Sequence, residues 1–389
     1  MGIIKRSSAT SLAGWLVLAA ALLCAISVTA YAMTRGGAPK PPKRSLASAL
    51  HRAVTAKPVP GLQAEFRVDQ HLLAGTSTSL SSNPLLAGAT GHVWIGGGHA
   101  RLVLDSQLGT TSIAFDGRKV TLYDRKHHVA YVLPVKHHEK PGGATERNAP
   151  SIGAISHALA RAAQFAVISG AIPSNVADQK AYTVHVSPRH NGGLFGEFDL
   201  AWDAAHGVPL RFAIFPRGSS TAAISVSVTH IRYGSVPASA LSATPPAGTR
   251  IVRVHMPDRH DRAAAHKPHV TTAVGQAAAS KAVGFTVAAP ETLAGLPQHR
   301  VRAIVVGSHR AALVTYGRGL GTVFVLEQRK TDAKTPLSAL PSVTVNGIRA
   351  HELDTTLGSV IQWSRGGVTY TIAGSQSAER IMSAAKSLT

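Results

Sequence analysis

The residues best suited to chemistry in this sequence are paired histidines on either side of a short apolar alternating run. They are His127-His128 and His137-His138-Glu139. Adjacent residues on a strand point to opposite faces, so each pair offers at most one ligand to each face. A zinc site needs three or four converging ligands. The spacing therefore predicts solvated loop histidines and no metal site.

Nucleophilic and phosphate chemistry finds little support in the sequence. The only cysteine, Cys24, lies inside a long apolar run. The sequence has no P-loop-type glycine-rich loop and no G-x-S-x-G nucleophile motif. Serines near histidines, such as Ser187 before His190, lie in turn-like sequence without a placed carboxylate partner. We therefore expect a protein that is not an enzyme and has no catalytic residue, no cofactor and no metal.

The N-terminal region predicts export from the cytoplasm. The run from Ser11 to Met33 carries no charged residue, and its length matches the ~20 residues that a helix needs to cross a bilayer. We expect residues 1–34 to form a single-pass anchor in the cell membrane, with the bulk of the chain extracytoplasmic. The alternative is secretion after signal cleavage near Ala32, because Ala30-Tyr31-Ala32 has the small-x-small pattern of a cleavage site.

The charge balance bears on possible partners. The sequence contains 40 Lys and Arg against 19 Asp and Glu, a formal net charge of +21, which attracts anionic lipid headgroups or polymers. The basic residues are scattered singly along polar strand faces, without the clustered helix or aromatic ladder of nucleic-acid modules. We expect no nucleic acid partner. With one cysteine, no intramolecular disulfide can form.

Composition and periodicity divide the chain into segments. We expect a Pro/Lys linker at residues 35–44, a first domain at 45–256, a linker at 257–271 and a smaller C-terminal α+β domain at 272–389. The second linker mixes charge with histidine and shows no periodicity. The fold class predicted for the whole chain is α+β.

The first domain alternates with the period of a β-strand. From Leu62 to Asp69, apolar residues alternate with charged or polar ones, which predicts a strand with one apolar and one solvated face. Similar runs, separated by short turns, favour an antiparallel meander. These runs are residues 92–95, 101–105, 112–115, 119–124, 129–133, 181–187, 196–202, 210–215 and 223–231.

Two helices are predicted among these strands. A short helix begins at Ser45, with Leu46, Leu50 and Val54 on one stripe. A second helix spans Ser151–Phe165, with Ser151 as N-cap, and we expect it to lie across the sheet.

The C-terminal domain repeats the mixture of helices and strands. We expect helices at residues 274–283 and from Ser377 onward. The predicted strands are residues 285–287, 301–306, 311–316, 322–328, 342–345, 360–364 and 368–373.

Three stretches of the first domain resemble the LolA/LolB/RseB-type lipoprotein-binding superfamily, an outer-membrane lipoprotein carrier-like group. They are FDGRKVTLYDRKHHVAYVLP (residues 115–134), LAWDAAHGVPLRFAIF (200–215) and ATPPAGTRIV (243–252). The resemblance implies a half-open antiparallel β-barrel with a helical lid over an apolar cavity. It places the predicted helix Ser151–Phe165 at the lid.

The C-terminal part resembles the extracytoplasmic domain of anti-sigma-factor-like envelope proteins. The stretches that carry this likeness are GFTVAAPETLAGLP (residues 284–297) and GSVIQWSRGGVTYTIAGSQSAERIMSAAKSL (358–388). Only about ten residues precede the apolar run, so we do not expect a sigma-binding cytoplasmic segment.

The resemblance and the alternation together give a functional hypothesis. We expect a non-enzymatic carrier or chaperone of the cell envelope that holds lipid acyl chains or a lipoprotein in an apolar cavity. The alternative is an RseB-type envelope-stress sensor that acts through an envelope protein partner. The same strand face could also simply be filled. The cavity candidates are Phe66, Val68, Leu102, Leu104, Phe115, Leu122, Phe212 and Ile214.

Overall fold

The computed structural model describes residues 39–73, 88–135, 150–242, 244–254, 270–306, 309–331, 337 and 340–388. The predicted membrane anchor and the histidines at positions 137 and 138 lie outside these residues. Within the described ranges, no helix is long and apolar enough to cross a membrane.

Among the residues that the structure describes, thirteen strands form the first sheet. Their bounds are β1 Gly61–Gln70, β2 Ala89–Gly96, β3 His99–Ser106, β4 Gly109–Phe115, β5 Lys119–Asp124, β6 Val129–Pro134, β7 Ala166–Ile168, β8 Ile172–Val176, β9 Gln179–Pro188, β10 Phe195–Asp203, β11 Pro209–Pro216, β12 Ile224–Tyr233 and β13 Arg250–Arg253.

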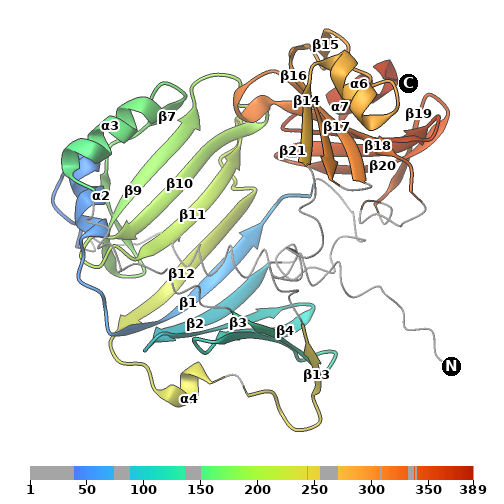
Figure 1. Ribbon diagram of the computed structural model, residues 1–389. Helices are drawn as coiled ribbons and strands as arrows, with labels where there is room; N and C mark the ends of the chain where they lie inside the picture. Colours follow the sequence, from blue (N-terminus) through green and yellow to red (C-terminus); the bar gives the residue numbers. More distant parts are fainter. Residues whose placement is uncertain are drawn as a thin grey trace.

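The sheet is built outward from β1 in two directions. Strands β2 to β6 follow on one side, and β12, β11, β10 and β9 follow on the other. These pairings are antiparallel, whereas β13 joins the edge of β6 in parallel. Figure 1 shows the sheet strongly bent, so that β9–β12 and β1–β4 form two walls. The predicted antiparallel sheet is confirmed, and it stays open and does not close into a barrel.

Helix α2 (Leu46–Val54) covers one end of this sheet. Its N-cap is Ser45, whose Oγ accepts a hydrogen bond from the Ser48 amide at 3.2 Å. The buried residues of the helix are Ala47 and Ala49, whereas Val54, predicted to line the apolar stripe, is 56% exposed. The small alanines allow the helix backbone to approach the sheet closely.

Helix α3 (Ile152–Ala162) begins after the predicted N-cap Ser151, whose Oγ accepts from the Ala154 amide. The prediction that this helix lies across the sheet is wrong. No side chain of α3 is buried, and the helix packs against α2. A hydrogen bond between His51 Nδ1 and the Pro150 carbonyl, at 2.9 Å, ties its start to α2. The helix that covers the sheet is therefore α2. A short helix, α4 (Ala238–Leu241), follows β12.

A second sheet of nine strands follows, in the order β14-β16-β17-β18-β22-β21-β20-β19 with β15 beside β16. The strands are β14 Val270–Val274, β15 Thr292–Leu293, β16 Leu296–Val306, β17 His309–Tyr316, β18 Val323–Arg329, β19 Ser342–Val345, β20 Ile348–Thr355, β21 Gly358–Arg365 and β22 Val368–Gly374; the helices are α6 Gln276–Val283, η3 Gly319–Gly321 and α7 Ala378–Ser387.

Several details of this sheet differ from the sequence prediction, which did not include strand β20. The helix predicted from Val274 begins at Gln276, because residues 270–274 pair with β16. The predicted strand 285–287 does not form: Val287 is fully buried in the loop after α6, where it packs in the same cluster as Val283. An apolar residue in a loop satisfies the same burial requirement as one on a strand.

A loop between β9 and β10 joins the two sheets directly. The Asn191 carbonyl accepts from the Gly321 amide at 2.7 Å, and the Leu194 amide donates to the Ser375 carbonyl at 2.9 Å. Between them, Gly193 has φ +61°, and a Cβ there would lie 1.9 Å from the Ser375 oxygen. Both the positive φ and the lack of space beside the Ser375 oxygen exclude a side chain at this position.

Candidate functional site

The apolar face of the first sheet is the first candidate site. Directly paired residues on neighbouring strands share a face of a sheet. In one row Leu122 pairs with Ile113, which pairs with Leu102. In the next row Leu104 pairs with Gly91, which pairs with Phe66.

The same face continues onto the other wall. Val68 pairs with Val226, and Val226 pairs with Phe212. Ile214 pairs with Ile224 in the following row, and Phe115 reaches the face through its pairing with Ala100. The register thus brings all eight residues predicted from the sequence to one face. Their role as lining of a lipid cavity stays a prediction.

Exposure differs along this face. Five of the eight side chains are buried: Phe66, Val68, Leu102, Leu104 and Leu122. The remaining three, Phe115, Phe212 and Ile214, are partly exposed. None of the eight lines the two pockets described below, and the five buried side chains pack in one hydrophobic cluster.

A glycine lies at the centre of the face. A Cβ on Gly91 would come within 2.3 Å of Phe66 Cζ, so the aromatic ring lies against the bare backbone of β2. Any side chain at position 91 would displace that ring. Glycine in a strand interior often marks such a close approach.

Helix α2 packs at the β9–β10 end of the sheet. Ala49 of the helix packs in a cluster with Tyr182, Val184 and Trp202. The Tyr182 hydroxyl donates to the Pro42 carbonyl at 2.6 Å. The segment that leads out of the N-terminal region is thereby fixed to the first sheet.

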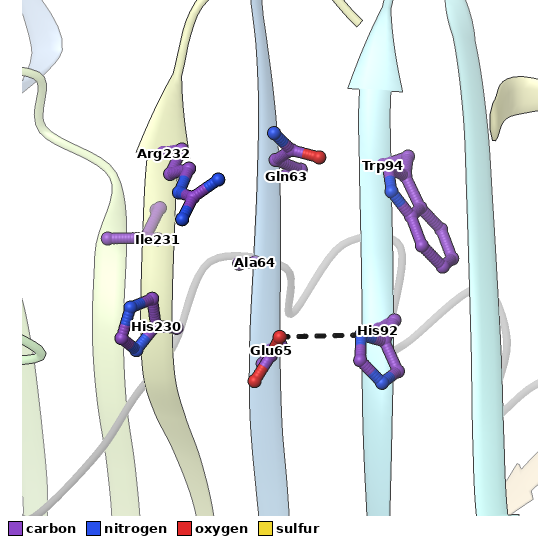
Figure 2. Close-up of a pocket in the computed structure, with 8 residues that line it drawn as sticks. All are labelled: Gln63, Ala64, Glu65, His92, Trp94, His230, Ile231 and Arg232. Carbon is purple, nitrogen blue, oxygen red and sulfur yellow. Dashed lines mark ion pairs between the residues drawn. The ribbon is translucent and has the colours of Figure 1, made fainter. Parts of the chain in front are cut away.

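The opposite face carries a small open pocket of about 250 Å³ on β12, β1 and β2. Figure 2 shows Glu65 beside His92, with 4.0 Å between the carboxylate oxygen and Nδ1. The His92 ring stacks on Trp94 at 5.6 Å, and the Arg101 guanidinium lies 5.5 Å from the Trp94 ring. These contacts are typical of a solvated polar face, and no catalytic geometry arises from them.

A larger cavity of about 630 Å³ lies where the segment after β12 crosses this opposite face. Its lining includes Ala114 and Val132 of the sheet and Leu241 of α4. Two cations, Lys119 and Arg253, also line it. Lys119 is already paired with Asp116 at 3.5 Å.

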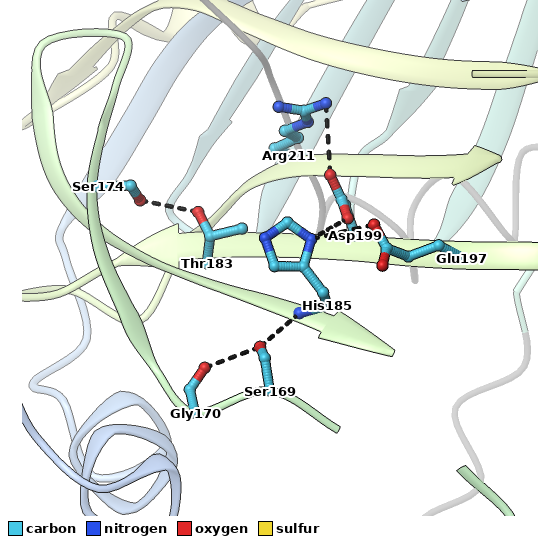
Figure 3. Close-up of polar contacts among 8 residues, drawn as sticks. All are labelled: Ser169, Gly170, Ser174, Thr183, His185, Glu197, Asp199 and Arg211. Atoms are coloured by element: carbon cyan, nitrogen blue, oxygen red, sulfur yellow. Dashed lines mark hydrogen bonds and ion pairs between the residues drawn. The ribbon is translucent and has the colours of Figure 1, made fainter. Parts of the chain in front are cut away.

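A polar cluster on β9, β10 and β11 is the second candidate site, and sequence reasoning missed it. His185 Nδ1 lies 2.5 Å from Asp199 Oδ1 and 3.4 Å from Glu197 Oε1. Asp199 Oδ2 lies 3.5 Å from the Arg211 guanidinium. Figure 3 shows the imidazole and both carboxylates converging above the strands. Glu197 and Asp199 alternate along one strand, and this spacing was the available signal, but only the register shows that Asp199 pairs with His185.

The pair His127-His128, which the sequence analysis considered as metal ligands, does not form such a cluster among the described residues. His127 Nδ1 lies 2.6 Å from Asp124 Oδ2 within the β5–β6 turn. His128 follows at φ +49° and is exposed. Neither belongs to the group of potential metal ligands found among the described residues. His137, His138 and Glu139 lie outside the described residues.

Several ionisable groups of the described structure have displaced pKa values. Burial and the Asp203 carboxylate, which accepts the Tyr233 hydroxyl at 2.9 Å, raise the pKa of Tyr233. In the second sheet, burial raises the pKa of Glu327 to about 7, although a hydrogen bond from the Ala288 amide opposes the shift. Neither group is adjacent to a candidate nucleophile in the described structure, so we assign them structural roles.

No protein-family model and no curated protein matches the chain. Among solved structures, the chain is similar to the MucA/MucB complex of Pseudomonas aeruginosa, with 15% identity, 87% of this chain and 96% of that chain covered, and a TM-score of 0.42. A LolA superfamily protein from Nitrosomonas europaea is 8% identical over 52% of this chain and 99% of its own, with a TM-score of 0.23.

A putative outer membrane lipoprotein-sorting protein domain from Vibrio parahaemolyticus is 11% identical, with 49% of this chain and 92% of that chain covered and a TM-score of 0.21. No residue role is transferred from these structures to this chain.

Proposed function

We propose that the chain is a non-enzymatic extracytoplasmic protein that binds lipid acyl chains on the apolar face of its first sheet. The observation that carries the proposal is the alignment of Leu122, Leu102, Phe66, Phe212 and the intervening residues in continuous rows across β5 to β11. A bent sheet with one continuous apolar face suits an elongated apolar ligand.

Burial energetics are sufficient for such binding. Each methylene removed from water contributes about 0.8 kcal/mol. Ten methylenes therefore contribute on the order of 8 kcal/mol, which before the costs of association corresponds to a Kd of about 1 μM. No polar anchor is required for useful affinity, and the eight candidate residues are all aliphatic or aromatic.

The proposed position next to a membrane follows from the N-terminal segment. Pro42 is bound to Tyr182, and the apolar run ends at Met33. The nine intervening steps span at most about 30 Å when extended. An anchor within residues 1–34 would therefore hold the first sheet close to the bilayer, the source of acyl chains.

The test uses two adjacent residues of β1 that face opposite sides. The full chain and its Phe66→Asp and Arg67→Asp variants are purified in mild detergent, and bound lipid is measured by native mass spectrometry and by extraction. Phe66 is buried on the apolar face, whereas Arg67 is exposed on the other. We expect lipid to be lost from Phe66→Asp and retained by Arg67→Asp.

A gentler variant separates loss of binding from loss of folding. Ile214 is partly exposed on the same face, so Ile214→Asn should leave the far-UV circular dichroism and the melting temperature nearly unchanged. Reduced lipid content in this folded variant supports the proposal. Equal lipid content in Phe66→Asp, Ile214→Asn and Arg67→Asp contradicts it.

The second candidate function is regulation through an envelope protein partner. The observation that favours it is the joint between the sheets, where Asn191 and Leu194 bind backbone groups of the second sheet. In this second function, a conformational change in the first sheet is transmitted to the second through these hydrogen bonds. A stable protein partner that co-purifies in the absence of lipid would favour this function over the carrier.

A further inference from the structure

The cluster of His185, Glu197 and Asp199 has the composition of a metal site. One ligand atom from each residue lies within 4.8 Å of the others. The three residues come from two adjacent strands, because Asp199 pairs directly with His185 and Glu197 lies two residues before Asp199 on the same face. A rigid sheet therefore holds the three groups together.

The distances are close to those of a coordinated ion. Ligands that bind Zn²⁺ tetrahedrally at about 2.0–2.2 Å are separated from one another by about 3.4 Å. The separation of His185 Nδ1 from Glu197 Oε1 is 3.4 Å. The separation of Nδ1 from Asp199 Oδ1 is 2.5 Å, so the imidazole must move away from Asp199 by somewhat less than 1 Å. The His185 side chain is 35% exposed, which leaves room for this rotation.

Neighbouring residues hold the three ligand groups in place, and the cluster remains open to solvent. Asp199 is 4% exposed, and Arg211 binds its second oxygen at 3.5 Å, so that Oδ1 remains the ligand atom facing the cluster. The backbone amide of His185 donates to Ser169 Oγ at 2.9 Å, which fixes the strand beneath the ring. Glu197 is 44% exposed and opens the cluster to solvent. The two carboxylates of the cluster outnumber its one guanidinium, which favours a cation.

We propose that His185, Glu197 and Asp199 form a binding site for a divalent transition-metal ion, with solvent as the remaining ligand. One imidazole and two carboxylates suit Zn²⁺ or Co²⁺. On binding, the ion takes the place of the proton that His185 Nδ1 shares with Asp199 Oδ1. That proton moves to Nε2, or it is released if the ring carries two protons.

The competing explanation is a structural ion network, in which His185 and Arg211 merely neutralise the buried carboxylate. Buried charges are normally paired in this way. In that explanation Glu197 only pairs with His185, at 3.4 Å, and no metal ion binds. The dependence of zinc affinity on Glu197 therefore distinguishes a metal site from an ion network.

The test is zinc titration of the full chain in detergent after chelator treatment, by calorimetry. The variants are Glu197→Gln and His185→Gln. The matched controls are Glu65→Gln and His92→Gln, a carboxylate and an imidazole on β1 and β2 that lie 4.0 Å apart and belong to no group of three potential ligands among the described residues. Bound Co²⁺ is followed by its visible absorption, which reports ligand geometry independently of affinity.

We expect one zinc site per chain whose affinity falls at least tenfold in Glu197→Gln and in His185→Gln and stays within twofold in both controls. The Co²⁺ absorption should change in the same two variants. Equal zinc affinity in Glu197→Gln and Glu65→Gln overturns the proposal, as does an absence of zinc uptake. Far-UV circular dichroism confirms folding, and the exposed Glu197 makes that variant the least disruptive. The site lies on the face opposite the acyl-chain candidates, so lipid uptake should be unaffected.

Discussion

The two sheets use the same alternation in different ways. In the second sheet, α6 and α7 pack against the inner face, where Ile361, Ile372 and Ile381 are fully buried in one cluster. In the first sheet, α2 covers only one end, and Phe212 and Ile214 stay partly exposed farther along the same face. The placement of helices decides whether a strand face becomes a closed core or a surface available to a ligand.

Truncation of an aromatic side chain should destabilise the closed core of the second sheet more than the partly exposed face of the first sheet. Trp363 is 2% exposed and stacks on Tyr370 with ring centroids 5.2 Å apart. Trp363→Ala should cost about 3–5 kcal/mol of unfolding free energy, the usual range for a buried aromatic. Phe212→Ala, on the partly exposed face, should cost less than half as much. Urea unfolding followed by far-UV circular dichroism measures both, and equal costs would mean that the first sheet is also closed.

The next prediction concerns the joint between the sheets. Gly193→Ala introduces a Cβ into the Ser375 carbonyl at a position with φ +61°, so it combines about 1–2 kcal/mol of backbone strain with a steric clash. Gly218 also has a positive φ, +73°, but a Cβ there would meet nothing within 4 Å. The Gly218→Ala variant therefore has the backbone strain without the steric clash. We expect Gly193→Ala to be the more destabilising by about 2 kcal/mol in urea unfolding, because overpacking typically costs 1–3 kcal/mol.

A similar loss in the two alanine variants would show that the contact with Ser375 is not required. If the joint couples the sheets, Gly193→Ala should also separate their thermal transitions in differential scanning calorimetry. Gly218→Ala should not.

A pH prediction applies to the second sheet alone. Burial raises the pKa of Glu327 from 4.5 to about 7, so between these values the folded protein holds a proton that the unfolded chain releases. Stability contributed by this group is present below about pH 4.5 and is lost as the pH rises to about 7, by roughly 3 kcal/mol at most. Glu327→Gln should remove this dependence.

The measurement is the free energy of unfolding at pH 5 and pH 8 in the wild type and in two variants. Glu291 is exposed in the same sheet region, so Glu291→Gln is the matched control and should retain the loss of stability at pH 8. A wild-type chain equally stable at both pH values would contradict the prediction.

Sequence patterns predicted the strands well where alternation was strong. The run from Leu62 to Asp69 became β1, Lys119–Asp124 matches β5, and the shared face of the eight apolar residues was anticipated. Short edge strands such as β7 and β8 were missed, because three to five residues carry too little periodicity.

The remaining misses depend on tertiary partners. On helix α2, Leu46 and Leu50 of the predicted stripe pack partly buried against the cluster that contains Ala49, whereas Val54 is exposed. His185 and Asp199 are 14 residues apart and meet only through the register of β9 and β10. Alternation assigns a residue to a face, but it does not say which residue of the next strand stands opposite.

A small effect on stability is expected at the end of the first sheet that α2 covers. Tyr182→Phe removes the hydroxyl that donates to the Pro42 carbonyl at 2.6 Å but keeps the ring packed near Trp202, at 6.0 Å between centroids. The cost should be about 1 kcal/mol, the net value of one hydrogen bond.

Tyr131→Phe, on the same face of the other wall, is the matched control, since it removes a hydroxyl without touching the N-terminal segment. Faster hydrogen exchange at residues 43–45 in Tyr182→Phe than in Tyr131→Phe would show that this bond fixes the segment before α2. Identical exchange in the two variants would show that α2 alone holds it.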